Sequence, residues 1–397
     1  MKTLHSGFDT IEFALQGALE PSAIETLVMA KERAVKEDRD IVTGLGKRGL
    51  KVRVKKTGHA GGYAFVIDTG PLGAVFRFKK NLGRENWNGF VKIGAESLAV
   101  HKRQKATNNA LKTVSEIGFV ITHISYNRVD YCIDILTDNL SINPDNFVAH
   151  SRTKKALYYR QETLNKGRTD NPIITRPIAL IDNPLKPRDN PFKPHNSPLE
   201  ALSVDDDETR NDALRKTAIM RGQSVESVTL GSMPGRQVIV YDKTAQIIAK
   251  RKFWWFNGWG LERAFFRANT ALSVTRVEIR AAKKELGKYG IKSHKDLESH
   301  IGNVLQKIAK QIRYVSPTEV DTNISRQPLH PLWKWVQMHL KCELENMTSQ
   351  VEPEIVLNGI RAQKKREYLD QIIGNSAGYS ICDEIPIDRV IETLPNA

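Results

Sequence analysis

Apolar and polar residues alternate along much of the first hundred residues, and a period of two predicts β-strands. Ile11, Phe13 and Leu15 alternate with polar neighbours, and residues 9–100 read as β-rich. Two apolar runs flank the turn formed by residues 70–73, Gly-Pro-Leu-Gly, which predicts a β-hairpin.

The pattern changes several times between residues 95 and 222. Residues 95–118 carry helix-forming residues and end at a glycine, which predicts a helix with a glycine cap. Residues 119–136 predict one or two strands. Residues 171–200 hold seven prolines, a density that excludes regular helix or a central strand and indicates a loop or insertion. Residues 205–222 are charged and helix-prone.

The last part of the chain first predicts strands and then helices. Residues 227–249 suggest two short strands around a turn at 231–235, and residues 271–282 suggest a third. From about residue 291 apolar positions recur every three or four residues, which is typical of helices. We therefore expect an α+β fold: a large antiparallel-sheet domain over residues 1–290, with an insertion at 171–200, and a helical C-terminal region over 291–397.

Charge narrows the class of partner. The 397 residues include 60 Lys plus Arg and 45 Asp plus Glu, a formal charge of +15, which favours a polyanion such as nucleic acid. No run approaches the roughly 20 apolar residues of a spanning helix, and the N-terminal residues do not form a signal-peptide core. We therefore expect a cytoplasmic protein that binds no membrane.

The three cysteines, Cys132, Cys342 and Cys382, lie far apart and form no CxxC pair. Neither a zinc site nor a disulfide framework can be built from them, so reduced thiols are expected.

Acidic residues on two predicted strands are candidates for a metal site. Alternation places Asp130 and Asp134 on one face of a strand, about 13 Å apart at roughly 3.3 Å per residue, too far to share one ion. A second strand carries Glu278 on one face between two arginines. If the two strands are neighbours, Asp130 and Glu278 could together bind Mg²⁺ or Mn²⁺. The alternative is that each carboxylate pairs with adjacent arginines on a solvated sheet face.

A tyrosine and a lysine share a face between those strands. Period-two alternation over residues 236–243 brings Tyr241 and Lys243 together. A nearby ammonium stabilises a phenolate and lowers the tyrosine pKa from about 10, which would help the phenol to attack phosphorus. The alternative is a packed aromatic residue with a solvated hydroxyl.

Three segments, in order, resemble the replication initiation factor family, the rolling-circle initiators of small plasmids and filamentous phages and the related relaxases of integrative elements. Residues 127–134 resemble its Thr-Arg-x-Asp strand with a second Asp four residues on, although Asn127 stands where the family has Thr. Residues 230–243 resemble its Gly-Ser turn and Tyr-Asp/Glu-Lys strand, and residues 275–278 its Thr-Arg-hydrophobic-Glu strand. The resemblance covers roughly residues 9–290.

The resemblance implies a DNA-strand transferase that nicks one strand at a replication origin through a 5′-phosphotyrosine and later rejoins it. Tyr241 would be the nucleophile, assisted by Lys243. Asp130, Glu278 and Asp134 would be the metal site, with Asp130 and Glu278 the direct ligands of Mg²⁺ or Mn²⁺ and Asp134 in a supporting role. The residues expected to contact DNA are Arg128, Arg236, Arg276 and Arg280. Partners would be single- and double-stranded origin DNA, with a host helicase and a second copy of the chain as further candidates.

Two other functions fit the same pattern. One is a non-catalytic DNA-binding regulator that keeps the fold and has lost the chemistry. The other is a conjugative relaxase, whose chemistry would be identical. A cluster of five aromatic residues, Phe253, Trp254, Trp255, Phe256 and Trp259, suits either core packing or the stacking of unpaired bases.

Overall fold

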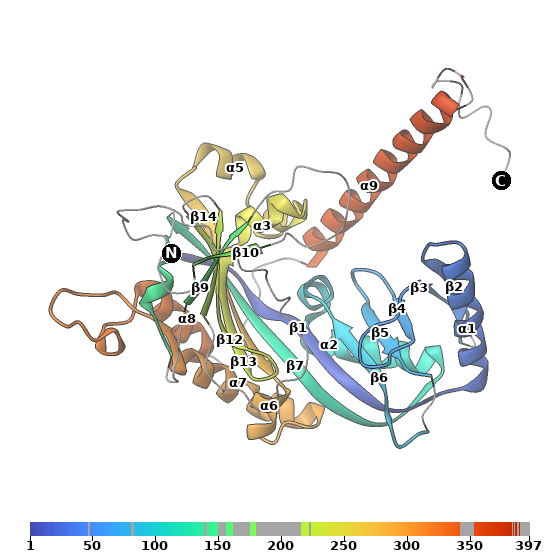
Figure 1. Cartoon of the computed structure of the whole chain (residues 1–397), viewed down its shortest axis with the longest axis horizontal. Coiled ribbons are helices and arrows are strands. Elements are labelled where there is room, and N and C mark those ends of the chain that lie inside the picture. Colours follow the sequence, from blue (N-terminus) through green and yellow to red (C-terminus); the bar gives the residue numbers. More distant parts are fainter. Residues whose placement is uncertain are drawn as a thin grey trace.

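The computed structural model describes residues 1–46, 48–80, 83–138, 141–149, 156–161, 175–179, 216–221, 224–341 and 353–382, together with 384, 386 and 389. One 13-stranded sheet organises these residues (Figure 1). In spatial order its strands are β10 (Thr175–Ala179), β9 (Ala156–Gln161), β11 (Lys216–Arg221), β12 (Ser224–Ser232), β13 (Arg236–Asp242), β14 (Leu272–Ala282), β7 (Phe119–Asp138), β1 (Lys2–Leu19), β6 (Trp87–Ile93), β5 (Ala74–Phe78), β4 (Phe65–Asp68), β3 (Leu50–Val54) and β2 (Ile41–Leu45). Every neighbouring pair is antiparallel except β9 and β11.

The two longest strands, β1 and β7, form the middle of the sheet and pair over almost their whole length. On one side, β14 and then β13 extend the sheet from β7; on the other side, β6 and then β5 extend it from β1. Because β14 pairs with residues 128–138 and β6 with residues 11–16, the two wings of the sheet are offset along the central pair. Within the sheet β1 therefore adjoins the β6 wing, and β7 adjoins the β14 wing.

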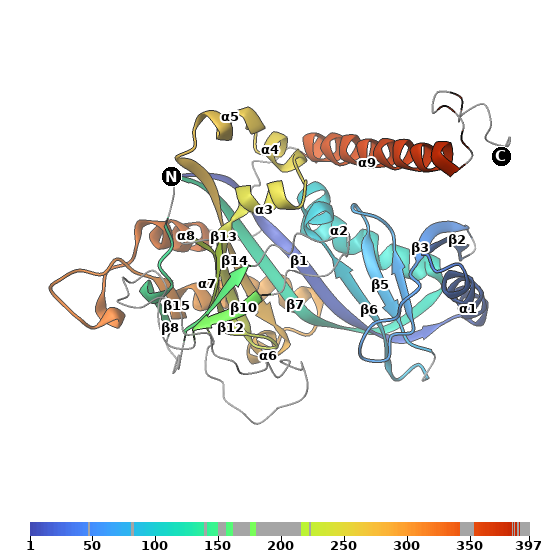
Figure 2. The ribbon, with the colours of Figure 1, turned by 45° about the horizontal axis from the view of Figure 1, so that its top comes forward.

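Helices cover the sheet on both sides (Figure 2). They are α1 (Pro21–Lys36), α2 (Ala95–Ile117), α3 (Lys243–Ala249), α4 (Trp254–Gly258), α5 (Arg263–Ala268), α6 (Lys283–Lys288), α7 (His294–Gln311), α8 (Pro331–Lys341) and α9 (Pro353–Cys382). Short 3-10 turns span Pro144–Asn146 and Ile324–Arg326, and a small second sheet pairs β8 (Phe147–Ala149) with β15 (Ile312–Tyr314). Among the described residues no helix combines the length and apolar character needed to cross a bilayer.

Most of the expected elements are present. The hairpin is β4 and β5, the helix over 95–118 is α2 with Gly118 in the left-handed conformation after it, and residues 119–136 lie in the single strand β7. The strands expected around 231–235 and at 271–282 are β12, β13 and β14.

One local expectation was wrong, and one was incomplete. Residues 216–221, expected to be helical, form β11, because their backbone groups pair with β12 and β9. The region 9–100 also contains α1, whose buried residues Ala23, Leu27, Ala30 and Ala34 follow a helical period. Within the Pro-rich segment 171–200, residues 175–179 form the edge strand β10, and the rest of that segment lies outside the described residues.

The C-terminal region is helical as expected, but residues 291–341 do not form a separate core. Buried residues of α7 and α8, such as Leu305 and Trp333, belong to the same hydrophobic cluster as Val277 of β14 and Tyr131 of β7. The apolar stripe of α7 needs a partner surface, and the sheet supplies it. In Figure 1 the helix α9 projects from the body of the molecule.

We predict that Leu305→Ala, at a fully buried position of α7, destabilises the whole fold and not a C-terminal unit alone. The expected loss is about 2–5 kcal/mol in a single urea transition, because the cavity opens inside the shared core. Lys310→Ala, at an exposed position of the same helix, should change the unfolding free energy by less than about 0.5 kcal/mol. Two separate transitions for Leu305→Ala, only one of them shifted, would contradict the shared core.

Candidate active site on strands β1, β7, β13 and β14

Charged side chains gather on one face of four adjacent strands at the centre of the sheet. In the register of β14 against β7, Arg276 lies opposite Asp134 and Arg280 lies opposite Asp130. Cross-strand partners share a face, so the alternation expected along residues 128–135 and 274–280 is observed. The other face of these strands is apolar and packs against α7.

Asp9 joins this face through a β-bulge in β1. Phe8 pairs with Tyr131 and Thr10 with Asp130, so Asp9 is an extra residue without an opposite partner in the ladder. A bulge redirects a side chain that simple alternation would place elsewhere. Counting back from Ile11, Phe13 and Leu15 in steps of two puts Asp9 on the apolar face, which is why the sequence pattern did not indicate it.

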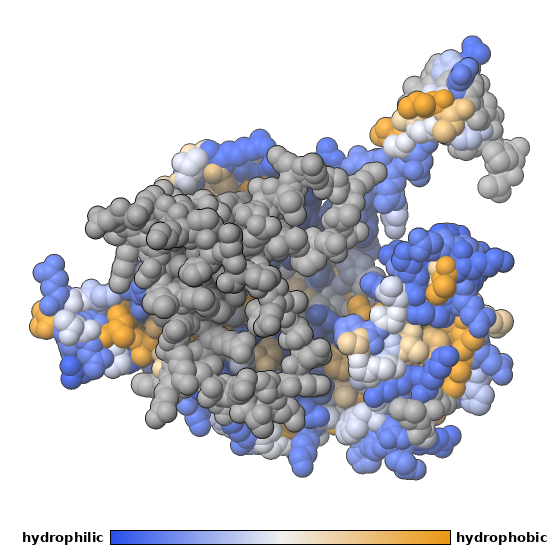
Figure 3. All heavy atoms as spheres, viewed as in Figure 1, coloured by the Kyte–Doolittle hydropathy of each residue, from blue (hydrophilic) through white to orange (hydrophobic). Residues whose placement is uncertain are grey.

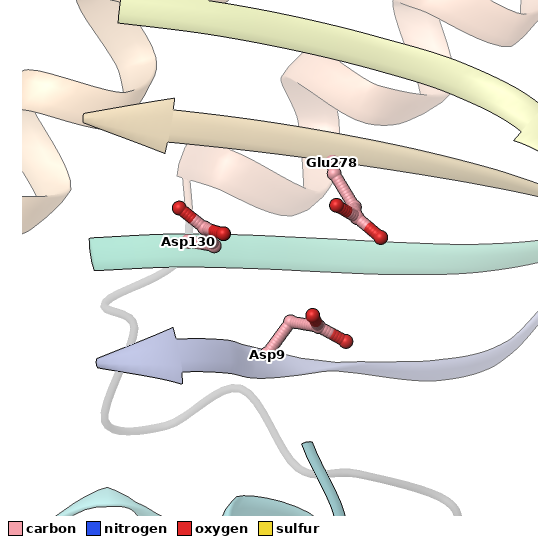
Figure 4. Close-up of side chains that lie close together, drawn as sticks. All are labelled: Asp9, Asp130 and Glu278. Carbon is pink, nitrogen blue, oxygen red and sulfur yellow. The ribbon is translucent and has the colours of Figure 1, made fainter. Parts of the chain in front are cut away.

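Three carboxylates from three strands consequently converge, as Figure 4 shows. One oxygen from each of Asp9, Asp130 and Glu278 lies within 4.8 Å of the other two. Asp130 is fully buried, Glu278 is nearly so, and Asp9 is partly exposed. The expected approach of Asp130 to Glu278 is therefore observed, although in the ladder Glu278 lies opposite Cys132, so the two carboxylates meet diagonally.

The donor set suits a hard divalent cation. Oxygen ligands about 2.1 Å from one Mg²⁺ ion lie within about 4.2 Å of each other, so a small side-chain movement would bring the three oxygens into that range. Carboxylates are the usual protein ligands of Mg²⁺ and Mn²⁺. Asp9, Asp130 and Glu278 therefore fit such an ion, whereas no histidine or cysteine belongs to the group.

Two arginines neutralise these carboxylates. Arg128 donates to both oxygens of Asp130, at 2.5–3.0 Å, and Arg280 donates to Glu278 Oε2 at 2.5 Å. The carboxylates thus pair with adjacent arginines, as the alternative interpretation expected. The pairs are buried, however, whereas that interpretation placed them on a solvated face. Burial raises the pKa of Asp130 to about 6, although Arg128 opposes the shift.

Asp134 belongs to a different interaction. Its two oxygens accept hydrogen bonds from Arg276 at 2.5 and 2.7 Å, and the Trp259 indole N–H donates to it at 3.2 Å. Burial alone would raise the pKa of Asp134, but the Arg276 charge outweighs burial and holds it below its usual value. Asp134, named with Asp130 and Glu278 for the metal, therefore lies outside the group of three, and Asp9 takes its place.

Arg276 connects the two sets of carboxylates. Besides its bonds to Asp134, its Nη1 donates to Asp9 at 2.7 Å, and its guanidinium lies 5.1 Å from the Trp255 ring centroid. Only 1% of Arg276 is exposed, so the expectation that it contacts DNA was wrong. Its hydrogen-bonding groups are used inside the protein to position Asp9 and Asp134.

The Tyr241 hydroxyl lies at the edge of the carboxylate group, where it donates a 2.6 Å hydrogen bond to Glu278 Oε1. Burial, together with Glu278 and Asp9, raises the pKa of Tyr241 well above its usual value, although Arg276 acts in the opposite direction. We expected the Lys243 ammonium to lower the pKa of Tyr241, but in the protein without DNA the pKa of Tyr241 is raised. The sequence could not show that Glu278 would accept the phenol proton, because the two residues meet only across β13 and β14.

Lys243 lies beside Tyr241 as expected, but as the first residue of α3 and not as a continuation of the strand. Its ammonium is 5.8 Å from the Tyr241 ring centroid and 5.4 Å from that of Trp255, and it donates to Gln246 Oε1 at 2.7 Å. Burial and the Arg276 charge lower the pKa of Lys243 to about 8. Its charge is thus close to titrating near neutral pH.

The remaining expected DNA contacts differ in position. Arg128 and Arg280 are about one-fifth exposed and line the carboxylate group, whereas Arg236 lies at the other end of β13 and pairs with Glu285 at 3.4 Å. The five clustered aromatic residues form core packing, which was one of the two expected roles. Four of them, Trp254, Trp255, Phe256 and Trp259, are buried together, and Phe253 packs against them.

Comparison with known proteins assigns the chain to no family. No protein-family model and no curated protein matches the chain. The structure is similar to that of a rolling circle replication initiator protein from Geobacillus stearothermophilus, with a TM-score of 0.38 and 10% sequence identity, over 85% of this chain and 96% of that one. A likeness of this size does not establish a shared activity.

We predict that Arg276→Met destabilises the fold by about 3–5 kcal/mol at pH 7, because it leaves buried Asp134 without its counter-charge. In the wild type the lowered pKa of Asp134 means that its ionised form stabilises the fold above pH about 4, and that this contribution is lost below it. In the variant that carboxyl should bind a proton more readily.

The deficit measured by urea unfolding should therefore shrink between pH 7 and pH 4. Arg39→Met, which removes an exposed ion pair with Glu37, is the control and should leave the unfolding free energy nearly unchanged at every pH. A deficit for Arg276→Met that stays constant with pH would contradict this account of Asp134.

Proposed function

We propose that this protein is a metal-dependent DNA-strand transferase that nicks and rejoins one strand through a tyrosyl phosphodiester, as a rolling-circle replication initiator does. The observation that carries the proposal is the hydrogen bond from the Tyr241 hydroxyl to Glu278, within a group of three carboxylates drawn from three strands. A phenol and a group of carboxylates that fits a divalent cation lie side by side, which supports phosphoryl transfer to the tyrosine.

The chain's residues can account for each proton and bond. The Tyr241 oxygen attacks the scissile phosphorus while its proton passes to Glu278, the acceptor of its hydrogen bond. A phosphorus–tyrosine bond forms and the bond to the 3′ oxygen breaks. Lys243, with a pKa near 8, can donate a proton to that oxygen, which leaves as a 3′-hydroxyl. The reverse sequence rejoins the strand without ATP, because the tyrosyl ester retains the energy of the broken bond.

A bound Mg²⁺ or Mn²⁺ would supply polarisation of the scissile phosphate. Asp9, Asp130 and Glu278 would hold it. Arg128 and Arg280, which now pair with two of these carboxylates, are the nearest partly exposed cations and could turn to the phosphate oxygens. The formal charge of +15 is consistent with DNA as the substrate.

The competing function is a DNA-binding regulator without chemistry. The observation in its favour is that Asp130, Glu278 and Asp9 already pair with Arg128, Arg280 and Arg276, so each carboxylate has a counter-charge without an ion. A regulator would not need a buried phenol in contact with that group, and this favours the enzyme. The relaxase of an integrative element would use the same chemistry, and the two roles differ in the DNA that they recognise.

We predict that Tyr241→Phe abolishes formation of the covalent protein–DNA adduct and leaves DNA binding nearly unchanged, while the loss of the hydrogen bond to buried Glu278 lowers the unfolding free energy by about 1–3 kcal/mol. Only the hydroxyl oxygen is lost, and the ring still packs beneath Lys243. The measurement is a nicking assay on supercoiled DNA of the protein's own replicon with Mn²⁺, followed by denaturing gel analysis for protein-linked DNA. Tyr289→Phe, a tyrosine outside the site, is the control. Adduct formation by Tyr241→Phe would exclude this nucleophile.

We predict that Asp9→Asn, Asp130→Asn and Glu278→Gln each weaken Mn²⁺ binding at least about tenfold, because each removes one charged oxygen ligand. Titration calorimetry on the protein without DNA gives a readout independent of nicking. Asp134→Asn should bind Mn²⁺ more nearly like the wild type, since Asp134 contacts Arg276, and exposed Asp138→Asn on the same strand is the control. Unchanged Mn²⁺ binding in Asp9→Asn would remove Asp9 from the site.

A further inference from the structure

A concave site lies outside the carboxylate group, between the middle of α9, the β4–β5 turn and the segment that follows α3. It is a cavity of about 700 Å³. Five basic side chains line it, namely Arg53, Lys92, Lys250, Lys252 and Lys364. In the visible face of the molecule the first half of α9 is hydrophilic, whereas its far half carries apolar side chains (Figure 3).

The acidic side chains of the cavity are already neutralised. Lys252 pairs with Glu96, Lys364 pairs with Glu367 at 2.8 Å, and Asp68 lies 3.9 Å from Lys55. Arg53 and Lys250 are exposed, and neither forms an ion pair with any described residue. The cavity therefore presents two uncompensated cations, an arrangement that attracts an anion.

An aromatic ring is available at the same place. Tyr368 of α9 lines the cavity and is 54% exposed. Bases of a single strand stack on exposed aromatic rings of this kind. A basic groove that carries an exposed aromatic has the two features by which proteins bind unpaired nucleic acid.

The cavity is connected to the nucleophile by rigid elements. The seven-residue helix α3 begins at Lys243 and is followed directly by Lys250, so it spans about 10 Å at 1.5 Å per residue. At about 3.4 Å per nucleotide this is some three nucleotides of a stacked strand. Trp254 lines the cavity and stacks at 4.6 Å on Trp255, the ring that contacts Lys243 and Arg276.

The position of α9 depends on a close contact. A Cβ at Gly359 would lie 2.2 Å from Trp254 Cβ, so only glycine lets α9 approach α4 this closely. The cavity wall that carries Lys364 and Tyr368 is thus held by packing and not by the charges that line the cavity.

From these features we propose that the cavity binds the single DNA strand about three nucleotides from the scissile phosphate, with Arg53 and Lys250 on backbone phosphates and Tyr368 stacked on a base. This inference rests on the proposed function, since it assumes a DNA substrate. It adds a subsite that holds the strand in place while the nick is open.

The test is binding of fluorescent oligothymidylates of 20 and 4 nucleotides, measured in EDTA so that no cleavage occurs. For the double variant Arg53→Ala/Lys250→Ala, affinity for the 20-nucleotide strand should fall at least about tenfold at 0.05 M salt, and the salt slope should fall by about 1.4, because two phosphate contacts are lost. Tyr368→Ala should weaken binding about 5- to 150-fold, and Tyr368→Phe should bind like the wild type.

The matched control is Lys295→Ala/Lys310→Ala, which removes two exposed lysines from α7 on the other side of the sheet. An equal change of salt slope in the control would overturn the proposal, as would unchanged slopes in the cavity variant. Displacement of the 20-nucleotide strand by micromolar ATP would make the cavity a nucleotide site and would also overturn it.

Other outcomes separate the two proposals. If the wild-type chain binds neither oligothymidylate nor origin DNA, the proposed function fails together with the subsite. If the cavity variant binds the 20-nucleotide strand as tightly as the wild type while Tyr241→Phe blocks the covalent adduct, the subsite alone is wrong.

Discussion

The balance of buried charge constrains the centre of this structure more than any other interaction. Asp130, Asp134 and Glu278 lie inside the sheet, and an ionised carboxylate is tolerated there only when cations and hydrogen-bond donors replace the lost water. Arg276 supplies two such bonds to Asp134 and one to Asp9, so a single guanidinium links β14 to both β7 and β1. The relative positions of three strands are thereby tied to the position of one side chain.

This charge balance also separates two kinds of carboxylate. Asp134 is fixed by Arg276 and Trp259 and keeps its charge, which suits a structural role. Asp9, Asp130 and Glu278 face one another. Arg128 and Arg280, the partners of Asp130 and Glu278, are partly exposed, whereas Arg276, which also pairs with Asp9, is buried and cannot move without leaving Asp134 unpaired. A buried ion pair and two partly exposed ion pairs thus lie side by side on the same sheet face.

The surroundings of Tyr241 extend this site toward the surface. The aromatic cluster of α4 buries Lys243 and thereby lowers its pKa toward neutrality. The packing of this cluster thus also sets the pKa of the lysine. The same cluster holds α9 through Gly359 and forms one wall of the basic cavity. A core that stabilises the fold therefore also fixes the distance between Tyr241 and the basic cavity.

Periodicity and turn residues are local properties, so the sequence by itself determined many of the elements: the strands β4, β5, β7, β12, β13 and β14 and the helices α2, α7 and α8. It also placed Asp130 on one face with Asp134, and Arg276 on one face with Glu278. The tertiary structure alone decided the rest. Residues 216–221 became a strand through pairing with neighbours distant in sequence. The helices after residue 290 joined the main core because their apolar stripes needed the sheet. Asp9 reached the carboxylate group through a bulge, and a bulge is created by the register between two strands, which no single stretch of sequence contains.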